Sequence, residues 1–427
     1  MTKIWNNIKG KKRTVVLRKF PHPYRAALSI CSDCDDTKTR KDFLTLQKFF
    51  NTDEKTNIGR GLSLETGNSI FMFSDNDHFS YFSGNQQDRL TIVELIKSGH
   101  IDCLHSYGER KNFTREDAQL AIQELKKKNC FLRVWIDHRR EGSNIGEHRT
   151  KGDGNNILSL CYHVDLTVAY GIRFVWVGAL TPIIGQSSRH YLGFFSVFNP
   201  RFPIRSSRKL IREVIKRLLG ILGYHKCRIY ATNDLVCPRN LGNGLKVYEF
   251  KRFYNHQDGF HNVDNLKSLG IMLSKKTLQK LKDSEGYMIL YTHFGKNFDC
   301  SQLIPQQTQK SLRNLASEYK NGNIYVTTTS KLLNYYTVNK YLNWSYEIDK
   351  NKIIIIIKDV QDPVFRSYIP SIDDLQGITF YIPDTKQAKI FIGDEEIKNI
   401  KTNPVDHTGQ ASVSIPLKPL IFPKFFF

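Results

Sequence analysis

Short apolar runs and amphipathic stretches alternate along most of this chain. Between residues 26 and 337, apolar runs such as AALSICS at 26–32 and FLRVWI at 131–136 are separated by stretches with a helical period. Apolar runs of this length predict strands, and amphipathic stretches predict helices. Because strands that alternate with helices form parallel sheets, the region predicts an α/β fold, and so many units favour a closed or nearly closed barrel.

The expected strands of this region lie at 26–32, 70–73, 101–104, 131–136, 172–177, 227–231, 247–253, 287–291 and 324–329. Helices are expected at 114–128, where Thr114 is a good N-cap, at 155–170, ended by Gly171, at 207–222 and from 332 onward. The helix at 207–222 is basic and amphipathic. Packing of its apolar face on the sheet is the favoured interpretation, and contact with a membrane surface is the alternative.

The pattern changes near residue 340. Strands are expected at 344–348, 353–357, 377–382, 388–392 and 411–415, with Gly, Pro and Asp between them and few helix signals. This pattern predicts a small all-β, sandwich-like domain. The expected organisation is therefore a basic N-terminal segment at 1–25, a barrel at 26–338 and an all-β domain at 340–427.

Composition narrows the class of protein. The 427 residues are 40% hydrophobic and 12% aromatic, which excludes global disorder. No run approaches the roughly 20 apolar residues of a membrane-spanning helix. No apolar segment follows the basic N-terminus, so no secretory signal is visible and a cytoplasmic location is expected. The eight cysteines are sparse and favour free thiols over a disulfide framework.

The chain is strongly basic, with 63 Lys and Arg against 41 Asp and Glu and a net charge of +22. The basic residues are scattered, and no zinc-finger spacing or aromatic RNA-binding signature accompanies them. A solvated basic surface is therefore favoured, and no nucleic-acid partner is expected. Nucleic-acid binding stays as an alternative that only the charge motivates.

Polar side chains that can do chemistry follow several of the expected strands. In parallel α/β folds the carboxyl ends of the strands build the active site, so these residues are expected to converge. Clustered carboxylates repel one another unless a cation lies between them, and His with carboxylates and water is the usual ligand set of a catalytic zinc. The candidates are Asp33, Asp35, Asp36, His105, Glu109, His138 and His293.

These residues give the chain a resemblance to the polysaccharide deacetylase superfamily, metal-dependent carbohydrate esterases on a distorted (β/α) barrel. The first family motif is an apolar strand that ends in Thr-Phe-Asp-Asp-Gly. Asp35 and Asp36 correspond to its two aspartates, with Cys34 at the aromatic position and Thr37 at the glycine position. The resemblance implies that Asp35 is the general base, with Asp33 as its rival, and that Asp36 binds a metal.

The second family motif is Gly-His-Glu, three residues, His-Thr/Ser, two residues, His. It is matched in register by Gly99, His100, His105 and Ser106. His105 is thus an implied metal ligand, and Glu109 stands where the family has its second metal-binding His. Glu109 and His138 compete for the third ligand position, and His138 is slightly favoured.

The late family motif, a Leu followed closely by a general-acid His, corresponds loosely to Leu290 and His293. The Arg-Pro motif of the family has no clear counterpart, although Arg133 lies on the corresponding strand. Among aromatic residues that could stack on sugar rings are Tyr107, Trp135 and Trp176, although core packing is favoured for the two Trp.

The resemblance implies hydrolytic removal of N- or O-acyl groups from a polysaccharide or oligosaccharide, with a divalent metal, zinc foremost, as cofactor. One alternative is a glycoside hydrolase that uses Asp35 and Glu109 as paired carboxylates. Another is a catalytically degenerate glycan-binding protein.

Overall fold

The computed structural model describes residues 14–139, 141–146, 150–188, 197–198, 200, 202–254, 265–349, 352–383 and 387–425. The chain falls into two compact units. Unit 1 comprises Met1–Tyr24 and Asn334–Lys418, and unit 2 comprises Arg25–Leu333 and Pro419–Phe427. Residues 1–13 of the expected N-terminal segment lie outside the described residues.

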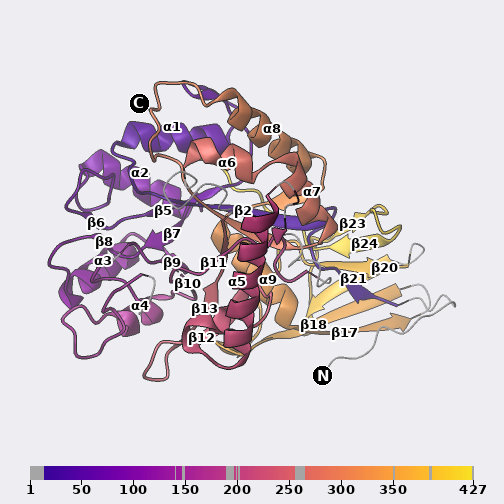
Figure 1. Cartoon of the computed structure of the whole chain (residues 1–427). Coiled ribbons are helices and arrows are strands. Elements are labelled where there is room, and N and C mark those ends of the chain that lie inside the picture. The colour runs from indigo at the N-terminus through magenta and orange to yellow at the C-terminus, as the bar shows by residue number, and fades with distance from the viewer. Residues whose placement is uncertain are drawn as a thin grey trace. The chain divides into compact units, whose positions relative to one another are not determined.

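Unit 2 is built on a curled, mostly parallel sheet (Figure 1). Its strands, in spatial order, are β11 (Leu180–Thr181), β14 (Arg252–Phe253), β15 (Tyr287–His293), β2 (Ala26–Asp33), β5 (Gly67–Ile70), β7 (Ile101–His105), β9 (Val134–Ile136), β10 (Phe174–Trp176), β13 (Lys246–Phe250) and β12 (Val236–Asn240), and β16 (Ile324–Val326) also pairs with β2.

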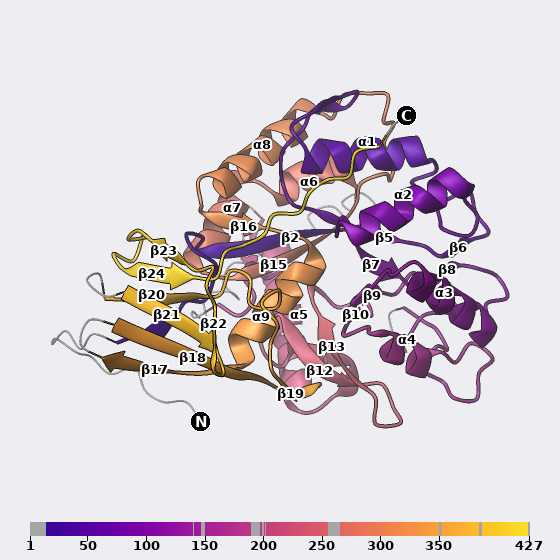
Figure 2. The ribbon, with the colours of Figure 1, turned by 180° about the vertical axis from the view of Figure 1, so that it is seen from behind.

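All pairs in this sheet are parallel except β12 with β13. The central strand β2 is buried over its whole length and runs beside β15 and β16, as Figure 2 shows from behind. Only Lys251 separates β13, which pairs with β10, from β14, which pairs with β15. The sheet is therefore curled, and the expected α/β class is confirmed.

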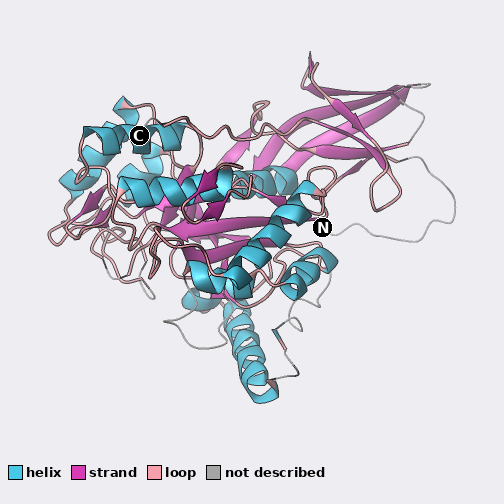
Figure 3. Ribbon diagram, turned by 90° about the horizontal axis from the view of Figure 1, so that it is seen from above, coloured by secondary structure: helices cyan, strands magenta, loops and turns pink. Residues whose placement is uncertain are grey.

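Helices flank the strands of this unit (Figure 3). They bury two hydrophobic clusters against the sheet, one around Phe71 and Trp135 and the other around Phe49 and Met288. The helices are α1 (Arg40–Asn51), α2 (Gln86–Lys97), α3 (Arg115–Lys127), α4 (Val164–Tyr170), α5 (Pro203–Ile221), the 3₁₀ helix η3 (His225–Tyr230), α6 (Leu266–Met272), α7 (Lys275–Asp283) and α8 (Gln306–Lys320), and α9 (Thr329–Tyr341) begins in unit 2 and ends in unit 1. Short pairs are formed by β3 (Lys55–Thr56) with β4 (Gly59–Arg60) and by β6 (Phe73–Ser74) with β8 (Gly108–Glu109).

Several expected elements differ from the structure. The strand expected at 70–73 is divided between the end of β5 and the start of β6. The strand expected at 227–231 is wrong, because η3 occupies this segment and packs so closely on Gly220 that a Cβ there would lie 2.4 Å from the Cys227 carbonyl oxygen. The helix expected at 155–170 is confined to α4, since the Asn- and Ser-rich residues before it form turns. The expected packing of the α5 apolar face is also wrong, because that face is exposed.

Unit 1 contains two sheets. One consists of β1 (Val16–Leu17), β20 (Thr379–Ile382), β24 (Ala411–Ser414) and β23 (Lys401–Asn403). The other consists of β17 (Leu342–Asp349), β18 (Lys352–Asp362), β21 (Gln387–Ile392) and β22 (Glu395–Glu396), with β19 (Arg366–Tyr368) beside β18. The rings of Trp344 and Phe380 meet between the two sheets, with centroids 4.8 Å apart.

The expected boundary near residue 340 falls at the end of α9, and β17 begins at the next residue without a loop. The terminal residues 419–427, expected in the all-β domain, belong to unit 2. There the Leu420 amide donates to Glu65, at 2.9 Å. All eight cysteines are free thiols, as expected, and no described helix is long and apolar enough to cross a bilayer.

A buried ion pair ties the ends of unit 1 together. The Arg18 guanidinium lies 2.8 Å from Asp406 and also donates to the backbone carbonyls of Phe20 and Pro21. Burial opposes ionisation of Asp406, but hydrogen bonds from Thr408, Tyr381 and Arg18 hold its pKa at about 2. Because this value is below that of an unfolded Asp, the carboxylate contributes stability above about pH 4, and this stability is lost as the pH falls toward 2.

We therefore expect Asp406→Asn to lower the free energy of unfolding of unit 1 by roughly 3 kcal/mol at pH 7, because Arg18 is left without its buried partner. The difference from the wild type should shrink as the pH falls from about 4 to about 2. Calorimetric unfolding over this pH range measures both effects. Asp373→Asn is the control. Its ion pair with Lys418 is exposed, so this substitution should lower the free energy of unfolding by less than about 1 kcal/mol. Equal effects of the two substitutions would contradict the prediction.

Candidate active site

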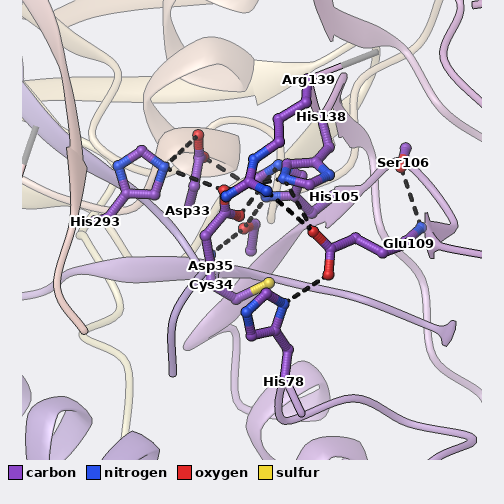
Figure 4. Close-up of polar contacts among 12 residues, drawn as sticks. Asp33, Cys34, Asp35, His78, His105, Ser106, Glu109, His138, Arg139 and His293 are labelled. Carbon is purple, nitrogen blue, oxygen red and sulfur yellow. Dashed lines mark hydrogen bonds and ion pairs between the residues drawn. The ribbon is translucent and has the colours of Figure 1, made fainter. Parts of the chain in front are cut away.

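Side chains from four parallel strands converge at one edge of the unit 2 sheet (Figure 4). Asp33 ends β2, and Asp35 follows it by two residues. His105 ends β7, His138 follows β9, and His293 ends β15. In the ladder between β2 and β15, His293 is the direct partner of Asp33. The expected convergence at the carboxyl ends of the strands is therefore present.

Asp35 is the centre of this cluster. Its carboxylate oxygens lie 3.6 Å from His105 Nε2, 3.1 Å from His138 Nε2 and 3.4 Å from His293 Nε2. Burial alone would raise the pKa of Asp35, but the imidazoles of His105 and His138 hold it well below its usual range. The carboxylate is therefore a buried anion ringed by three imidazoles.

His105 is oriented by a hydrogen bond on its far side. Its Nδ1 lies 2.9 Å from Ser69 Oγ, which also accepts the Cys34 amide. Burial lowers the pKa of His105 to about 4, so the ring is neutral near pH 7. His binds metals as a neutral imidazole, through one of its ring nitrogens. In His105 the nitrogen that faces the Asp35 carboxylate is Nε2.

The loop after β9 fixes His138. Asn144 accepts the His138 amide with its side-chain oxygen and donates to the His138 carbonyl, at 2.8 and 2.7 Å. The neighbouring Asp137 accepts four hydrogen bonds, from the Trp135 indole, the Ile145 and Gly146 amides and the Thr150 hydroxyl. This carboxylate holds the loop in shape, and His138 is placed by the loop.

Asp33 forms a two-pronged ion pair with Arg252, at 2.7 and 3.0 Å, and both side chains are buried. The guanidinium lies 3.5 Å from the ring centroid of Trp176 and 4.3 Å from that of Tyr291. Two parallel hydrogen bonds and two ring faces fix the Arg252 plane. Asp33 is thus held 3.9 Å from both His105 Nδ1 and His293 Nε2.

Glu109 joins the cluster from the other side, 3.6 Å from His138 Nε2. Burial opposes its ionisation, but hydrogen bonds from His78 and Asn76 lower the pKa of Glu109 to about 2. The same bond to Glu109, 2.7 Å long, raises the pKa of His78. Gly108 makes this position possible, because a Cβ there would lie 2.0 Å from the Phe73 carbonyl oxygen.

The backbone is strained where three of these strands end. Asp36, Ser106 and Arg139 have φ of 62°, 44° and 41°, in the left-handed region that non-glycine residues seldom adopt. Strain of this kind gathers at functional sites. It also turns Asp36 outward, where its side chain is 37% exposed and lies 3.8 Å from His78 Nε2. The structure thus places Asp35 and not Asp36 against His105 and His138.

Among the described residues, two groups of side chains could each hold a metal ion. One is Cys34, Asp35 and His105, and the other is Glu109, His138 and Glu141. In addition, Asp35 Oδ1 and both ring nitrogens of His138 are buried without a hydrogen bond. Buried polar atoms rarely lack a partner, so these atoms fit the role of ligands to a bound cation.

A cavity of about 840 Å³ opens onto the cluster. The acidic and imidazole groups lie at one part of its wall, and Trp176, Tyr254 and Tyr291 line another. Lys209, Arg212 and Lys216 of α5, with Lys296, add positive charge. The cavity can therefore take a polar, ring-shaped ligand with an anionic or electron-rich part.

Several residues differ from their sequence-based roles. Tyr107 and Trp135 are fully buried in the core, as favoured for Trp135 but not expected for Tyr107. Trp176 is also buried, as favoured, and it contributes to the cavity wall. Arg133 is exposed, and the arginine of the site is Arg252. His78 was also missed. The sequence feature that could have pointed to Arg252 is the pair Lys251–Arg252 inside the largely apolar run VYEFKRFY at 247–254. His78 lies in a polar loop, where no comparable feature marks it.

No family model, curated protein or solved structure matches the chain.

The Arg252–Asp33 pair yields a first test of the site. Arg252→Met should lower the free energy of unfolding by about 3–5 kcal/mol, because Asp33 is left as a buried, unpaired charge. Adding Asp33→Asn should restore part of the loss. Urea unfolding measures both variants, with Arg115→Met as the control, since the Arg115–Asp165 pair has the same geometry but is partly exposed. The prediction fails if Arg252→Met and Arg115→Met lower the free energy of unfolding by the same amount.

Metal content gives a second test. Asp35→Asn should lose bound divalent metal, because this carboxylate reaches His105 and His138 at once. Asp36→Asn is the matched control and should retain metal, since its side chain points outward. Elemental analysis of the purified proteins gives the stoichiometry. Loss of metal in the Asp36 variant alone would restore the assignment implied by the family resemblance.

Proposed function

We propose that unit 2 is a distorted (β/α) barrel of the polysaccharide deacetylase type and that it removes N- or O-acyl groups from carbohydrate. In this proposal the two sheets of unit 1 form a sandwich-like companion domain. The observation that carries it is the buried Asp35, ringed by imidazoles from three strands beside the arginine-held Asp33. This set combines metal ligands with separate groups for proton transfer.

The residues that would hold the metal, zinc foremost, are Asp35, His105 and His138, with Glu109 within reach of His138. When bound, the metal supplies a Lewis acid that polarises the acyl carbonyl and acidifies a water molecule. His105 is preset for this task because its Ser69 contact and its lowered pKa keep Nε2 neutral. Asp35 takes the ligand role that the resemblance gave to Asp36.

Asp33 and His293 then divide the proton transfers. Asp33 is the carboxylate placed to accept the proton of the attacking water, since Arg252 fixes its orientation with two hydrogen bonds. His293 Nε2 lies 3.9 Å from Asp33 and 3.4 Å from Asp35, and in its protonated form it donates to the leaving amine or alkoxide. The proton that Asp33 takes up balances the one that His293 gives to the leaving group, and exchange with water resets both side chains for the next turnover.

The cavity supports the proposed substrate class. Its aromatic wall fits sugar rings, which stack on Trp and Tyr faces, and its volume exceeds that of a single monosaccharide. The glycosidase alternative is weaker, because a glycosidase needs one carboxyl group with a raised pKa as general acid. Both Asp35 and Glu109 instead have lowered pKa values.

Acetate release from N-acetylated chito-oligosaccharides and O-acetylated xylan tests the proposal. Activity should disappear with a chelator and return with zinc, and His293→Ala should lower kcat by about 10²–10⁴-fold. His407→Ala in unit 1 is the control and should keep full activity. New reducing ends without acetate would support a glycosidase, and glycan binding without turnover would support a degenerate binding protein. Either result overturns the proposal.

A further inference from the structure

Helix α5 carries an apolar face that no described residue covers. Ile211, Ile215 and Leu218 are 58%, 50% and 55% exposed, and Leu222 just beyond the helix is 80% exposed. Isolated exposed apolar residues are ordinary, but a contiguous row along one helix marks a contact surface. Figure 1 shows α5 as a long helix in the foreground, drawn in front of the strands of unit 2.

The opposite side of α5 is the one that packs against unit 2. Its buried residues are Ser206, Glu213 and Gly220, spaced by two turns each. At 100° per residue these three lie opposite Ile211, Ile215 and Leu218. The close contact between Gly220 and the Cys227 carbonyl fixes this rotation, because a side chain at Gly220 has no room. The apolar face is therefore held outward by the fold.

Positive charge flanks the outward face. The helix has six basic residues and one acidic residue, which is the buried Glu213 in contact with Lys216 at 2.5 Å. The outward side of α5 thus presents apolar residues with cations beside them and no carboxylate. Of the basic residues, Arg205, Arg208 and Arg212 are exposed beside the apolar face, Lys209 and Lys216 line the cavity, and Arg217 lies on the packed side with Ser206.

We propose that α5 docks unit 2 on an anionic lipid bilayer, with its apolar face at the acyl boundary and its basic residues against headgroup phosphates. A basic amphipathic helix with a large apolar face lies in the plane of such an interface. Tyr224, exposed just beyond the end of α5, has the amphipathic ring that favours the headgroup level, and the exposed Phe202 at the other end adds apolar area. A second copy of the chain fits less well, because a two-fold contact through α5 would set its basic residues against themselves.

Docking would also place the site cavity at the lipid surface. Lys209, Arg212 and Lys216 belong to α5 and line the cavity beside the candidate active site. A ligand carried on the bilayer would then lie next to the cavity entrance. The docking surface itself stands independently of the proposed function, since it rests on the exposure and charge of α5 alone.

Vesicle sedimentation tests the proposal without any assay of activity. The full chain should sediment with vesicles of phosphatidylcholine and phosphatidylglycerol, and much less with phosphatidylcholine alone or at high salt. The double variant I211S/L218S should lower the partition by at least about tenfold, and R208A should lower it by about fivefold. Neither variant should shift Tm, since these side chains are exposed.

The control is L158S/L160S, which removes equally apolar side chains, 92% and 83% exposed, from a loop elsewhere in unit 2. It should bind vesicles as the wild type does. The proposal is overturned if I211S/L218S binds normally or if the loop variant loses as much. It is also overturned if the wild type ignores anionic vesicles and I211S/L218S instead converts a dimer to a monomer in sedimentation velocity.

Discussion

The parallel pairing of β2 with β15 is the constraint on which the candidate site depends. Seven residue pairs run in register from Ala27 beside Tyr287 to Asp33 beside His293. Both strands are almost wholly buried, so a slip of one residue would turn apolar side chains out of the core and is strongly disfavoured. The same register that protects the core therefore decides which acid meets which imidazole at the edge of the sheet.

Charge balance is the second condition for this arrangement. Asp33 and Asp35 are two carboxylates within three residues, both nearly without solvent, and neither could stay ionised there alone. Arg252 compensates Asp33 with two hydrogen bonds, and three imidazoles surround Asp35. Asp33 is therefore satisfied within the protein, whereas Asp35 and His138 retain unsatisfied polar atoms. Asp33 is therefore held in one orientation, whereas Asp35 and His138 have atoms with which to bind a ligand.

Helix α5 connects the site with the surface of unit 2. Its buried side includes Glu213 and Gly220, its flank adds Lys209 and Arg212 to the cavity, and its apolar residues point outward. A helix that served only to cover the sheet would bury its apolar face, as the α3 helix does with Ala118, Ala121 and Leu125. The reversed orientation of α5 leaves apolar side chains exposed to solvent, which is consistent with the proposed contact surface.

The sequence by itself determined the elements and the edge at which chemistry gathers. Apolar runs placed β2, β7, β9 and β15, and the polar residues after them named Asp33, Asp35, His105, His138 and His293 as one group, because strand period and strand ends are local properties. Only the tertiary structure showed that Asp35 lies in the cluster and Asp36 outside it, since the backbone at Asp36, with φ of 62°, turns its side chain outward. It also decided that Arg252, distant in sequence, pairs with Asp33, and that the apolar face of α5 is exposed. These outcomes depend on which distant segments meet in space. The spacing of apolar residues along the chain predicts a strand or a helix, but it carries no information about the segment that packs against it.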